Sequence, residues 1–363
     1  HGLATSSEAR SRAVHMLDRV GIPNPKQLMG QYPHELSGGM RQRVMIAMMM
    51  LLEPDILIAD EPTTALDVTV QAQILDLLRD IVQDTSIGLI LITHDMGVVA
   101  EMAEDVMVMK AGSVVEAGSV HQIFRAPSDA YTCALLEAVP SVETASEILT
   151  STESQALLSA KHLSKSFSGS RTFGIAASVT KAIDDVSLDI LPGETLALVG
   201  ESGSGKSTLG RILARLTPTD QGSVTLGGTD LLSLEGAQLR RARRKIQMIF
   251  QDPYASLDPR QSIGAAIAEP IKIQTTLSKV ERQERVSQLL ARVGLTPDMA
   301  SRFPHEFSGG QRQRVAIARA IAAGPELIIA DEPTSALDVS IQAQILELLS
   351  ELKSEHGLTM LFI

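Results

Sequence analysis

Short apolar runs of β-strand type alternate with stretches of helical periodicity along much of the chain. Residues 195–199 are such a run, and further runs lie at residues 56–59, 89–92, 246–250 and 327–330. Strands separated by helices are typical of a largely parallel sheet with helices on its faces. The longest apolar run, residues 44–52, has nine residues, far fewer than the roughly 20 that a membrane-spanning helix needs. The pattern therefore predicts an α/β fold without a membrane span.

The chain contains a long internal repeat. The segment PHELSGG at residues 33–39 returns as PHEFSGG at residues 304–310, and residues 59–78 return at residues 330–349 with four conservative changes. Residue 33 thus corresponds to residue 304 and residue 59 to residue 330, a constant offset of 271. A period of this length indicates a duplicated domain rather than a solenoid.

The repeat also predicts that each copy is incomplete. A glycine-rich loop at residues 200–207 has no counterpart within the first copy, and the counterpart of His94 would fall at position 365. We therefore expect both ends to be cuts. Residues 1–125 are expected to be the C-terminal part of a first domain without its phosphate loop. An extension and polar linker would follow at residues 126–155, and residues 156–363 would form a second domain that lacks its C-terminal end.

Composition restricts the functions that such a chain could serve. It has 43 acidic and 32 basic residues and a net charge of −11. This balance argues against a nucleic-acid-binding protein, which normally presents a basic face. Cys133 is the only cysteine, so the chain can form neither an internal disulfide framework nor a four-thiolate metal site.

The glycine-rich loop GESGSGKS at residues 200–207 matches the phosphate-binding pattern GxxxxGK[ST]. Its glycines would let backbone N–H groups converge on phosphate oxygens, and the N-terminus of the following helix would add partial positive charge. Lys206 is expected to reach the β- and γ-phosphates of ATP, and the Ser207 hydroxyl is expected to ligate Mg²⁺. The predicted nucleotide-binding residues of this loop are Gly200, Ser202, Gly203, Gly205, Lys206, Ser207 and Thr208.

A pair of carboxylates follows an apolar strand in each copy. The pairs are Asp60 with Glu61 and Asp331 with Glu332. The first carboxylate of a pair suits Mg²⁺, directly or through water, so Asp60 and Asp331 are predicted metal ligands. The second is placed to orient or deprotonate an attacking water, so Glu61 and Glu332 are predicted catalytic residues. A solvated acidic strand end is the alternative, but two copies in a chain with a phosphate loop favour ATP hydrolysis.

A serine and two glycines open a predicted helix in each copy, and they provide a hydroxyl, two N–H groups and a helix N-terminus for an anion. These segments resemble the signature motif of ABC ATPases, which distinguishes them from other phosphate-loop enzymes. The resemblance implies two tandem P-loop NTPase domains, each with a mainly parallel sheet, flanking helices and a helical subdomain that carries the signature. In that family the signature contacts the ATP held by the opposite domain. The signature residues are Ser37, Gly38, Gly39, Ser308, Gly309 and Gly310.

Several other positions resemble elements of the same family. Gln251 resembles the Q-loop glutamine, which senses Mg²⁺ and couples to membrane subunits, and His94 resembles the switch histidine that contacts the γ-phosphate. Phe167 is the candidate for stacking on adenine, and residues 65–67 and 336–338 resemble the D-loop. The methionine-rich run at residues 44–52 is expected to be the buried signature helix rather than a metal or cofactor site.

Two segments resemble the oligopeptide/dipeptide/nickel importer ATPases in particular. These are QDPYASLDPR at residues 251–260 and PSDAYTCALL at residues 127–136, where Asp-Ala replaces the usual His-Pro of the extension. Tandem copies in one chain resemble the fused importer ATPases of glutathione or microcin-type peptides. The resemblance implies an ATPase on the cytoplasmic face of the bacterial inner membrane that powers import of peptides or related solutes. Its partners would be two permease subunits and, indirectly, a solute-binding protein.

The resemblance further implies that two ATP molecules lie head to tail between the copies. Lys206, Ser207, Gln251 and Asp331 would bind one, capped by the signature of the first copy. The other site would keep Asp60, Glu61, His94 and the second signature, without a phosphate loop. The alternatives are a soluble tandem-cassette ATPase acting on ribosomes, a DNA-repair ATPase, and an inactive remnant of a transporter gene. The first would need a long charged helical linker and no importer-type extension.

Overall fold

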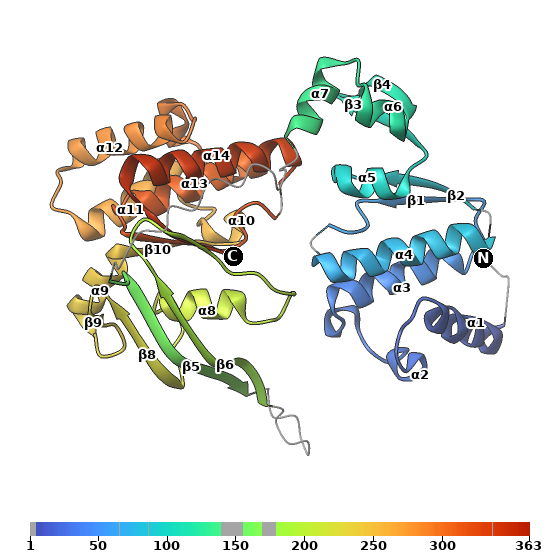
Figure 1. The fold of residues 1–363 in the computed structure, drawn as a ribbon, viewed down its shortest axis with the longest axis horizontal. Helices are drawn as coiled ribbons and strands as arrows, with labels where there is room; N and C mark the ends of the chain where they lie inside the picture. The colour runs from blue at the N-terminus through green and yellow to red at the C-terminus, as the bar shows by residue number, and fades with distance from the viewer. Residues whose placement is uncertain (1–4, 65, 86, 139–154, 169–178, 336) are drawn as a thin grey trace. The chain divides into compact units, whose positions relative to one another are not determined.

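The computed structural model describes residues 5–64, 66–85, 87–138, 155–168, 179–335 and 337–363 (Figure 1). The chain divides into two compact units, His1–Ser141 and Val142–Ile363. The linker expected within residues 126–155 lies outside the described residues from 139 to 154. No helix in the described part of the chain is long and apolar enough to cross a membrane.

The central sheet of the second unit is parallel, and its strands are in the order β10–β11–β12–β7. Ile249 pairs with Ala330, and Ala330 pairs with Phe362. Because these strands are parallel and end in register, the residues that follow β10 and β11 leave the sheet at the same edge. The expected α/β fold is confirmed here. The strands are β7 (Thr195–Ala197), β10 (Ile246–Ile249), β11 (Leu327–Ala330) and β12 (Thr359–Phe362).

A second sheet is antiparallel, with the strand order β6–β5–β8–β9. One apolar cluster joins this sheet, helix α8 (Lys206–Leu213) and one face of the parallel sheet. Leu163 of β5, Ile212 of α8 and Ile329 of β11 are fully buried in it. Helix α8 is thereby fixed against both sheets. The strands are β5 (Leu158–Ser168), β6 (Val179–Ile190), β8 (Gln221–Leu226) and β9 (Thr229–Asp230).

Helices cover the opposite face of the parallel sheet (Figure 1). Ile328 of β11 belongs to this second apolar cluster, whereas Ile329 belongs to the first. Strand β11 is therefore buried on both faces, which explains its continuous apolar sequence. The longer helices are α11 (Ile263–Gln274), α12 (Lys279–Arg292), α13 (Gly309–Ile321) and α14 (Val339–His356). The shorter elements are α9 (Gly236–Lys245), α10 (Pro253–Ser256), η3 (Pro297–Ser301) and η4 (Pro304–Glu306).

The first unit contains a parallel pair, β1–β2, and an antiparallel pair, β3–β4. The core lies on one face of β1–β2, where Leu57 packs with Ile46 of α3 and Leu78 of α4. The strands are β1 (Ile56–Asp60), β2 (Gly88–Ile92), β3 (Asp105–Lys110) and β4 (Ser113–Ser119). The helices are α1 (Ser6–Arg19), α2 (Pro25–Leu28), η1 (Pro33–Glu35), α3 (Gly38–Met50), α4 (Val68–Thr85), α5 (Met96–Met102), α6 (Val120–Arg125) and α7 (Ala130–Glu137).

The expectation of a fully buried helix at residues 44–52 is wrong in part. Ile46, Ala47 and Met50 of α3 are buried, but Met45, Met48 and Met49 are about half exposed. Residues 45 and 49 correspond to Ala316 and Ala320 of α13, which are buried because α13 also packs against α10 and α11; the counterparts of α10 and of most of α11 would precede residue 1. An unbroken apolar run therefore predicted the helix but could not predict which of its sides is covered.

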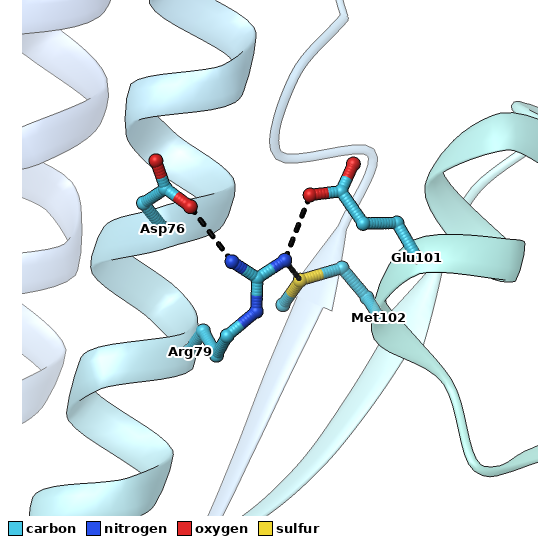
Figure 2. A network of polar contacts seen from close by, with 4 residues as sticks. All are labelled: Asp76, Arg79, Glu101 and Met102. Atoms are coloured by element: carbon cyan, nitrogen blue, oxygen red, sulfur yellow. Dashed lines mark hydrogen bonds and ion pairs between the residues drawn. The ribbon is translucent and has the colours of Figure 1, made fainter.

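Helix α5 is held against α4 at both of its ends, and Figure 2 shows the contact near its C-terminus. Near its C-terminus, Arg79 Nη2 donates to Glu101 Oε1 at 2.8 Å. At its N-terminus, Gln71 Nε2 donates to Asp95 Oδ2 at 3.2 Å, and Asp95 also caps α5. These contacts fix the short segment between β2 and α5, which carries His94. Arg79 contacts Asp76 and Met102 as well.

The extension at residues 127–136 is fastened to strand β4 by a buried carboxylate. Glu116 accepts hydrogen bonds from the hydroxyl and the N–H of Ser128 at 2.6 and 2.8 Å, and from the N–H of Asp129 at 3.1 Å. The Ser128 hydroxyl and these backbone donors lower the pKa of Glu116 to about 2, because they stabilise its charged form. Asp129 in turn caps α7, so one carboxylate positions the start of the extension helix.

We predict that this carboxylate makes the first unit sensitive to acid. The pKa of Glu116 is lower in the folded state than its ordinary value of 4.5. The stabilisation that Glu116 contributes is therefore complete above pH 4.5 and is lost as the pH falls toward about 2. Glu116→Gln should lower the melting temperature at pH 6, and this difference from the wild type should shrink below pH 4.5. Thermal unfolding between pH 3 and 6 would measure it. Glu137→Gln, at an exposed carboxylate of α7, is the control. A difference that is constant across this range would contradict the prediction.

The second glycine of each signature is needed for close packing between helices. A Cβ atom on Gly310 would lie 2.6 Å from Ile341 Cγ2 of α14, and one on Gly39 would lie 2.4 Å from Val70 Cγ1 of α4. Real Cβ atoms do not approach that closely. A Cβ on Gly309, by contrast, would be 3.5 Å from Leu337 Cδ2, an ordinary contact.

We therefore predict opposite tolerance at two adjacent glycines. Gly310→Ala should destabilise the second unit by about 1–3 kcal/mol, because the added methyl group overpacks the contact between α13 and α14. Gly309→Ala should cost little, since Ala is the better helix former. Denaturant unfolding of both variants would measure the difference. Equal effects would show that the packing of Gly310 is not limiting.

Candidate functional site

The phosphate loop of the second unit connects β7 to α8 and has a backbone that requires glycine. Gly203 and Gly205 have φ angles of +80° and +98°, in the left-handed region. A Cβ atom on Gly205 would also lie 2.2 Å from the carbonyl oxygen of Ala182. Lys206 Nζ donates to the carbonyl oxygens of Gly200 and Glu201 at 2.6 and 2.8 Å, so the ammonium group lies over the loop.

A hydroxyl–carboxylate pair lies at the base of this loop. Ser207 Oγ donates to Asp331 Oδ1 at 2.8 Å, although 124 residues separate them in the chain. Asp331 is 1% exposed, and its Oδ2 has no hydrogen-bond partner among the described residues. A buried carboxylate oxygen without a partner is costly. The pair therefore fits a hard cation that prefers oxygen ligands, such as Mg²⁺.

The donor set limits how such an ion could be held. In the described residues, no group of three or more His, Cys, Asp or Glu side chains could hold a metal ion. A cation at Ser207 and Asp331 would therefore need phosphate oxygens or water as further ligands, which is how Mg²⁺ is usually bound at nucleotide sites.

Glu332 and Gln251 leave the parallel sheet beside this pair. Gln251 Nε2 donates to Glu332 Oε2 at 2.6 Å, so the structure brings the predicted Q-loop glutamine to the predicted catalytic carboxylate. Glu332 has a φ of +44°, and its N–H donates to the carbonyl oxygen of Ile363 at 3.0 Å. A left-handed conformation costs about 1–3 kcal/mol in a residue other than glycine. The backbone is held in this conformation by the neighbouring strand.

The first unit repeats this arrangement at Glu61. Its φ is +45°, and its N–H donates to the carbonyl oxygen of Ile92 at 2.8 Å. The hydroxyl of Thr64 donates to Glu61 Oε2 at 2.7 Å, and His94 Nδ1 lies 3.1 Å from Oε1. Hydrogen bonds from Thr64 and then His94 lower the pKa of Glu61. The carboxylate therefore stays ionised at neutral pH, as a water-orienting base must be.

The two acidic pairs differ in their first members. Asp331 is buried against Ser207, whereas Asp60 is exposed and makes no side-chain hydrogen bond in the described part of its unit. Sequence reasoning gave both the same role. It also missed Thr64, although a hydroxyl three residues after Glu61 in a tight turn was a usable signal.

Both signature serines begin their helices. Ser37 Oγ accepts from the N–H of Met40, and Ser308 Oγ accepts from the N–H of Gln311, each at 3.3 Å. The serines and the first glycine of each motif are exposed, and the glycine N–H groups at the helix starts have no intrahelical partner and suit an anion. The N–H of Ser308 is occupied, since it donates to Gln311 Oε1 at 3.1 Å. Helix α3 begins at Gly38 and helix α13 begins at Gly309, and both residues are exposed.

The remaining predicted positions have less definite surroundings. Phe167 lies on β5 with about half of its surface exposed, and Lys165 Nζ is 5.5 Å from its ring centroid. Ser202 is exposed in the loop, and Thr208 lies half-buried in the first turn of α8. The D-loop positions 65 and 336 lie outside the described residues.

Comparison with known proteins gives consistent matches. The family model described as ABC transporter matches residues 3–64 and 183–335. The glutathione import ATP-binding protein GsiA of Pectobacterium atrosepticum is 50% identical over 381 residues, which cover 98% of this chain and 61% of the relative. The protein of the same name from Escherichia coli O6:H1 is 50% identical over 389 residues, which cover 100% of this chain and 62% of the relative. The chain thus spans about three fifths of the length of these relatives.

A solved structure is similar as well. It is the dimeric ATP-binding cassette MJ0796 in a post-hydrolysis state bound to ADP and Pi. Its TM-score is 0.51 and its identity 33%, over 56% of this chain and 86% of that one.

We predict that Asp331 and Asp60 respond differently to the same substitution. Asp331→Asn should abolish the stabilisation by ATP that depends on Mg²⁺, because it removes the charge of the buried, unpartnered oxygen. Saturating ligand at about 100 times its Kd would stabilise the wild type by about 2.7 kcal/mol. Thermal shifts with ATP plus Mg²⁺ or EDTA would measure this. Asp60→Asn is the matched control and should keep the response. Retention of the Mg²⁺ effect in Asp331→Asn would exclude Asp331 as the ligand.

Proposed function

The chain belongs to the ABC transporter family, and on this premise we propose that its second unit binds ATP with Mg²⁺ and hydrolyses it. The observation that carries this proposal is the buried Ser207–Asp331 pair at the base of a glycine-rich loop. The adjacent Gln251–Glu332 pair supplies the carboxylate that would activate water for attack on the γ-phosphate. The longer protein would couple this hydrolysis to import of a solute.

In the proposed mechanism each residue acts on one part of the nucleotide. Lys206 exchanges its bonds to the carbonyl oxygens of Gly200 and Glu201 for phosphate oxygens. Ser207 and the free oxygen of Asp331 would hold Mg²⁺, which would supply positive charge next to the phosphate oxygens. Gln251 orients the Glu332 carboxylate, and Glu332 accepts the proton of the attacking water. The strained backbone of Glu332 keeps that carboxylate aimed without a further conformational change.

We further propose that the first signature caps this ATP in the working protein. The exposed helix start at Ser37 and Gly38 offers a hydroxyl and free N–H groups to the γ-phosphate. The equivalent start at Ser308 and Gly309 would serve a second nucleotide, together with Glu61 and His94. The contact between His94 and Glu61 supports this role, because it pairs a γ-phosphate sensor with a water-orienting base.

The proposed partners are membrane permease subunits, which would place the protein at the cytoplasmic face of the membrane. A pocket of about 340 Å³ in the second unit supports a docking site close to Gln251. Phe250, Ser256, Leu216 and Ile273 are among its lining residues, and the side chains of Leu216 and Ile273 are exposed. Exposed apolar side chains around a concave surface are typical of sites for another protein.

The proposed cargo is a small peptide or a peptide-like solute. The relatives named for glutathione import support this class, since glutathione is a tripeptide. The extension at residues 127–136 supports an importer over a ribosome-associated ATPase, because Glu116 holds it in an ordered helix on the first unit.

We predict that Glu332→Gln in the longer protein separates ATP binding from hydrolysis. Loss of the general base should reduce turnover by about 10²–10⁴-fold at that site, while Mg²⁺-dependent ATP binding remains. Phosphate release and solute uptake in membrane vesicles with the permeases would measure both. Glu61→Gln is the matched variant and tests the other predicted base. Unaltered hydrolysis in Glu332→Gln would remove Glu332 from this role.

A further inference from the structure

The segment that follows Gln251 is a short rigid turn, helix α10. Asp252 caps it by accepting from the N–H of Tyr254 at 2.8 Å. Gln251 itself is bonded to Glu332. Gln251, which contacts the proposed catalytic carboxylate, therefore directly precedes α10 in the chain. A displacement of Gln251 must displace the start of α10.

Two arginines of helix α13 hold α10. Arg319 Nη1 donates to the carbonyl oxygen of Ser256 at 2.7 Å. The guanidinium of Arg312 lies 5.0 Å above the ring of Tyr254, and its Nε donates to the carbonyl oxygen of Pro304 at 2.8 Å. Positions 312 and 319 are two helical turns apart, so both side chains project from one face of α13. Helix α10 is thus held at both its ends.

The contact of Arg319 with Ser256 matters more than its ion pair. Arg319 Nη2 also lies 3.1 Å from Glu269, but these side chains are 36% and 44% exposed. Ion pairs that open to solvent contribute little. The bond to the Ser256 carbonyl is charge-assisted, and its acceptor belongs to the backbone of α10 itself. The backbone of α10 is therefore tied directly to α13.

The same helix begins with the signature. Arg312 donates its N–H to the carbonyl oxygen of Ser308 at 2.9 Å, within the first turn of α13. An unbroken chain of contacts therefore runs from Glu332 through Gln251, α10 and Arg312 to Ser308.

We propose that Arg319 and Arg312 are positioning residues that make the segment after Gln251 and the signature helix of the second unit move as one body. ATP bound at Lys206 and Asp331 then changes the position of Ser308 and Gly309 in the same unit. This inference rests on the proposed function, because it requires nucleotide binding at that site. The coupling element is a contiguous set of packed and hydrogen-bonded groups.

The first copy carries a different residue at the position of Arg319. Residue 48 corresponds to residue 319 at the offset of the repeat, and it is a methionine. Its side chain is 56% exposed and cannot donate a hydrogen bond to a carbonyl group. The counterparts of Tyr254 and Ser256 would precede residue 1 at this offset, so the links of Arg312 and Arg319 to α10 are described in the second unit alone.

The test is hydrogen exchange of the whole chain with and without Mg²⁺ and a non-hydrolysable ATP analogue. In the wild type, the analogue should slow exchange at the phosphate loop and change it at residues 309–312. Arg319→Met copies the first unit. It should keep the response of the phosphate loop but reduce the response at residues 309–312 by about tenfold, as expected for loss of a bond to a charged group. Arg319→Lys should restore part of it, since Lys keeps the charge but not the planar fork.

Two variants separate coupling from general damage to the helix. Arg314→Met removes another arginine of α13, one that bonds the carbonyl oxygen of Val293 and Gln344 rather than α10, and it should leave the signature response intact. Glu269→Gln should change it little. The response must also be independent of protein concentration, which excludes contacts between chains.

The possible outcomes are distinguishable. If Arg319→Met leaves the signature response unchanged while the phosphate loop still responds, the inference is wrong and the proposed function stands. If Arg314→Met reduces the response equally, the effect is loss of helix stability, and the inference is also wrong. If the analogue alters exchange nowhere in the wild type, the proposed function fails and the inference fails with it.

Discussion

The hydrogen bond between Ser207 and Asp331 joins two segments that lie 124 residues apart, and the proposed chemistry of the second unit depends on it. It forms because α8 packs against the face of the parallel sheet that also contains β11. Ile212 and Ile329 are buried together in that contact, so apolar packing sets the position of the polar pair. Hydrophobic burial therefore fixes a hydroxyl and a carboxylate at a separation that neither segment could define alone.

The parallel pairing of β10 and β11 likewise sets the positions of Gln251 and Glu332. Strands β10 and β11 end in register, so Gln251 and Glu332 emerge at one edge and meet. The left-handed φ of Glu332 then turns its carboxylate out of the strand direction. Glu61 has the same conformation, held by the same kind of bond to the next strand. The same costly conformation at two equivalent carboxylates supports the proposal that it directs these side chains toward the nucleotide.

Much of the fold and site followed from local sequence signals. Apolar runs predicted the parallel strands β1, β2, β7, β10 and β11, but not the antiparallel sheet β6–β5–β8–β9 or the pair β3–β4. The glycine pattern predicted the phosphate loop, because left-handed backbone at Gly203 and Gly205 leaves few residue choices. The exposure of Met48 could not be predicted, since an apolar run does not report which neighbours are present. The packing role of Gly310 was also hidden, because it depends on Ile341 of another helix. Motif logic explained Gly310 by anion binding alone.

The two acidic pairs show how far an identical motif determines chemistry. Asp60 and Asp331 follow equivalent strands and precede equivalent glutamates, yet one is exposed and the other is buried with an unpartnered oxygen. The difference comes from the hydroxyl of Ser207 and the helix that carries it, not from the motif. Burial raises the cost of an unpaired carboxylate oxygen and therefore its preference for a cation. A carboxylate in water gains much less from the same ion, because solvent screens the attraction. Metal affinity is thus a property of the enclosure that surrounds the aspartate, and Asp60 lacks this enclosure here because the counterpart of Ser207 would precede residue 1.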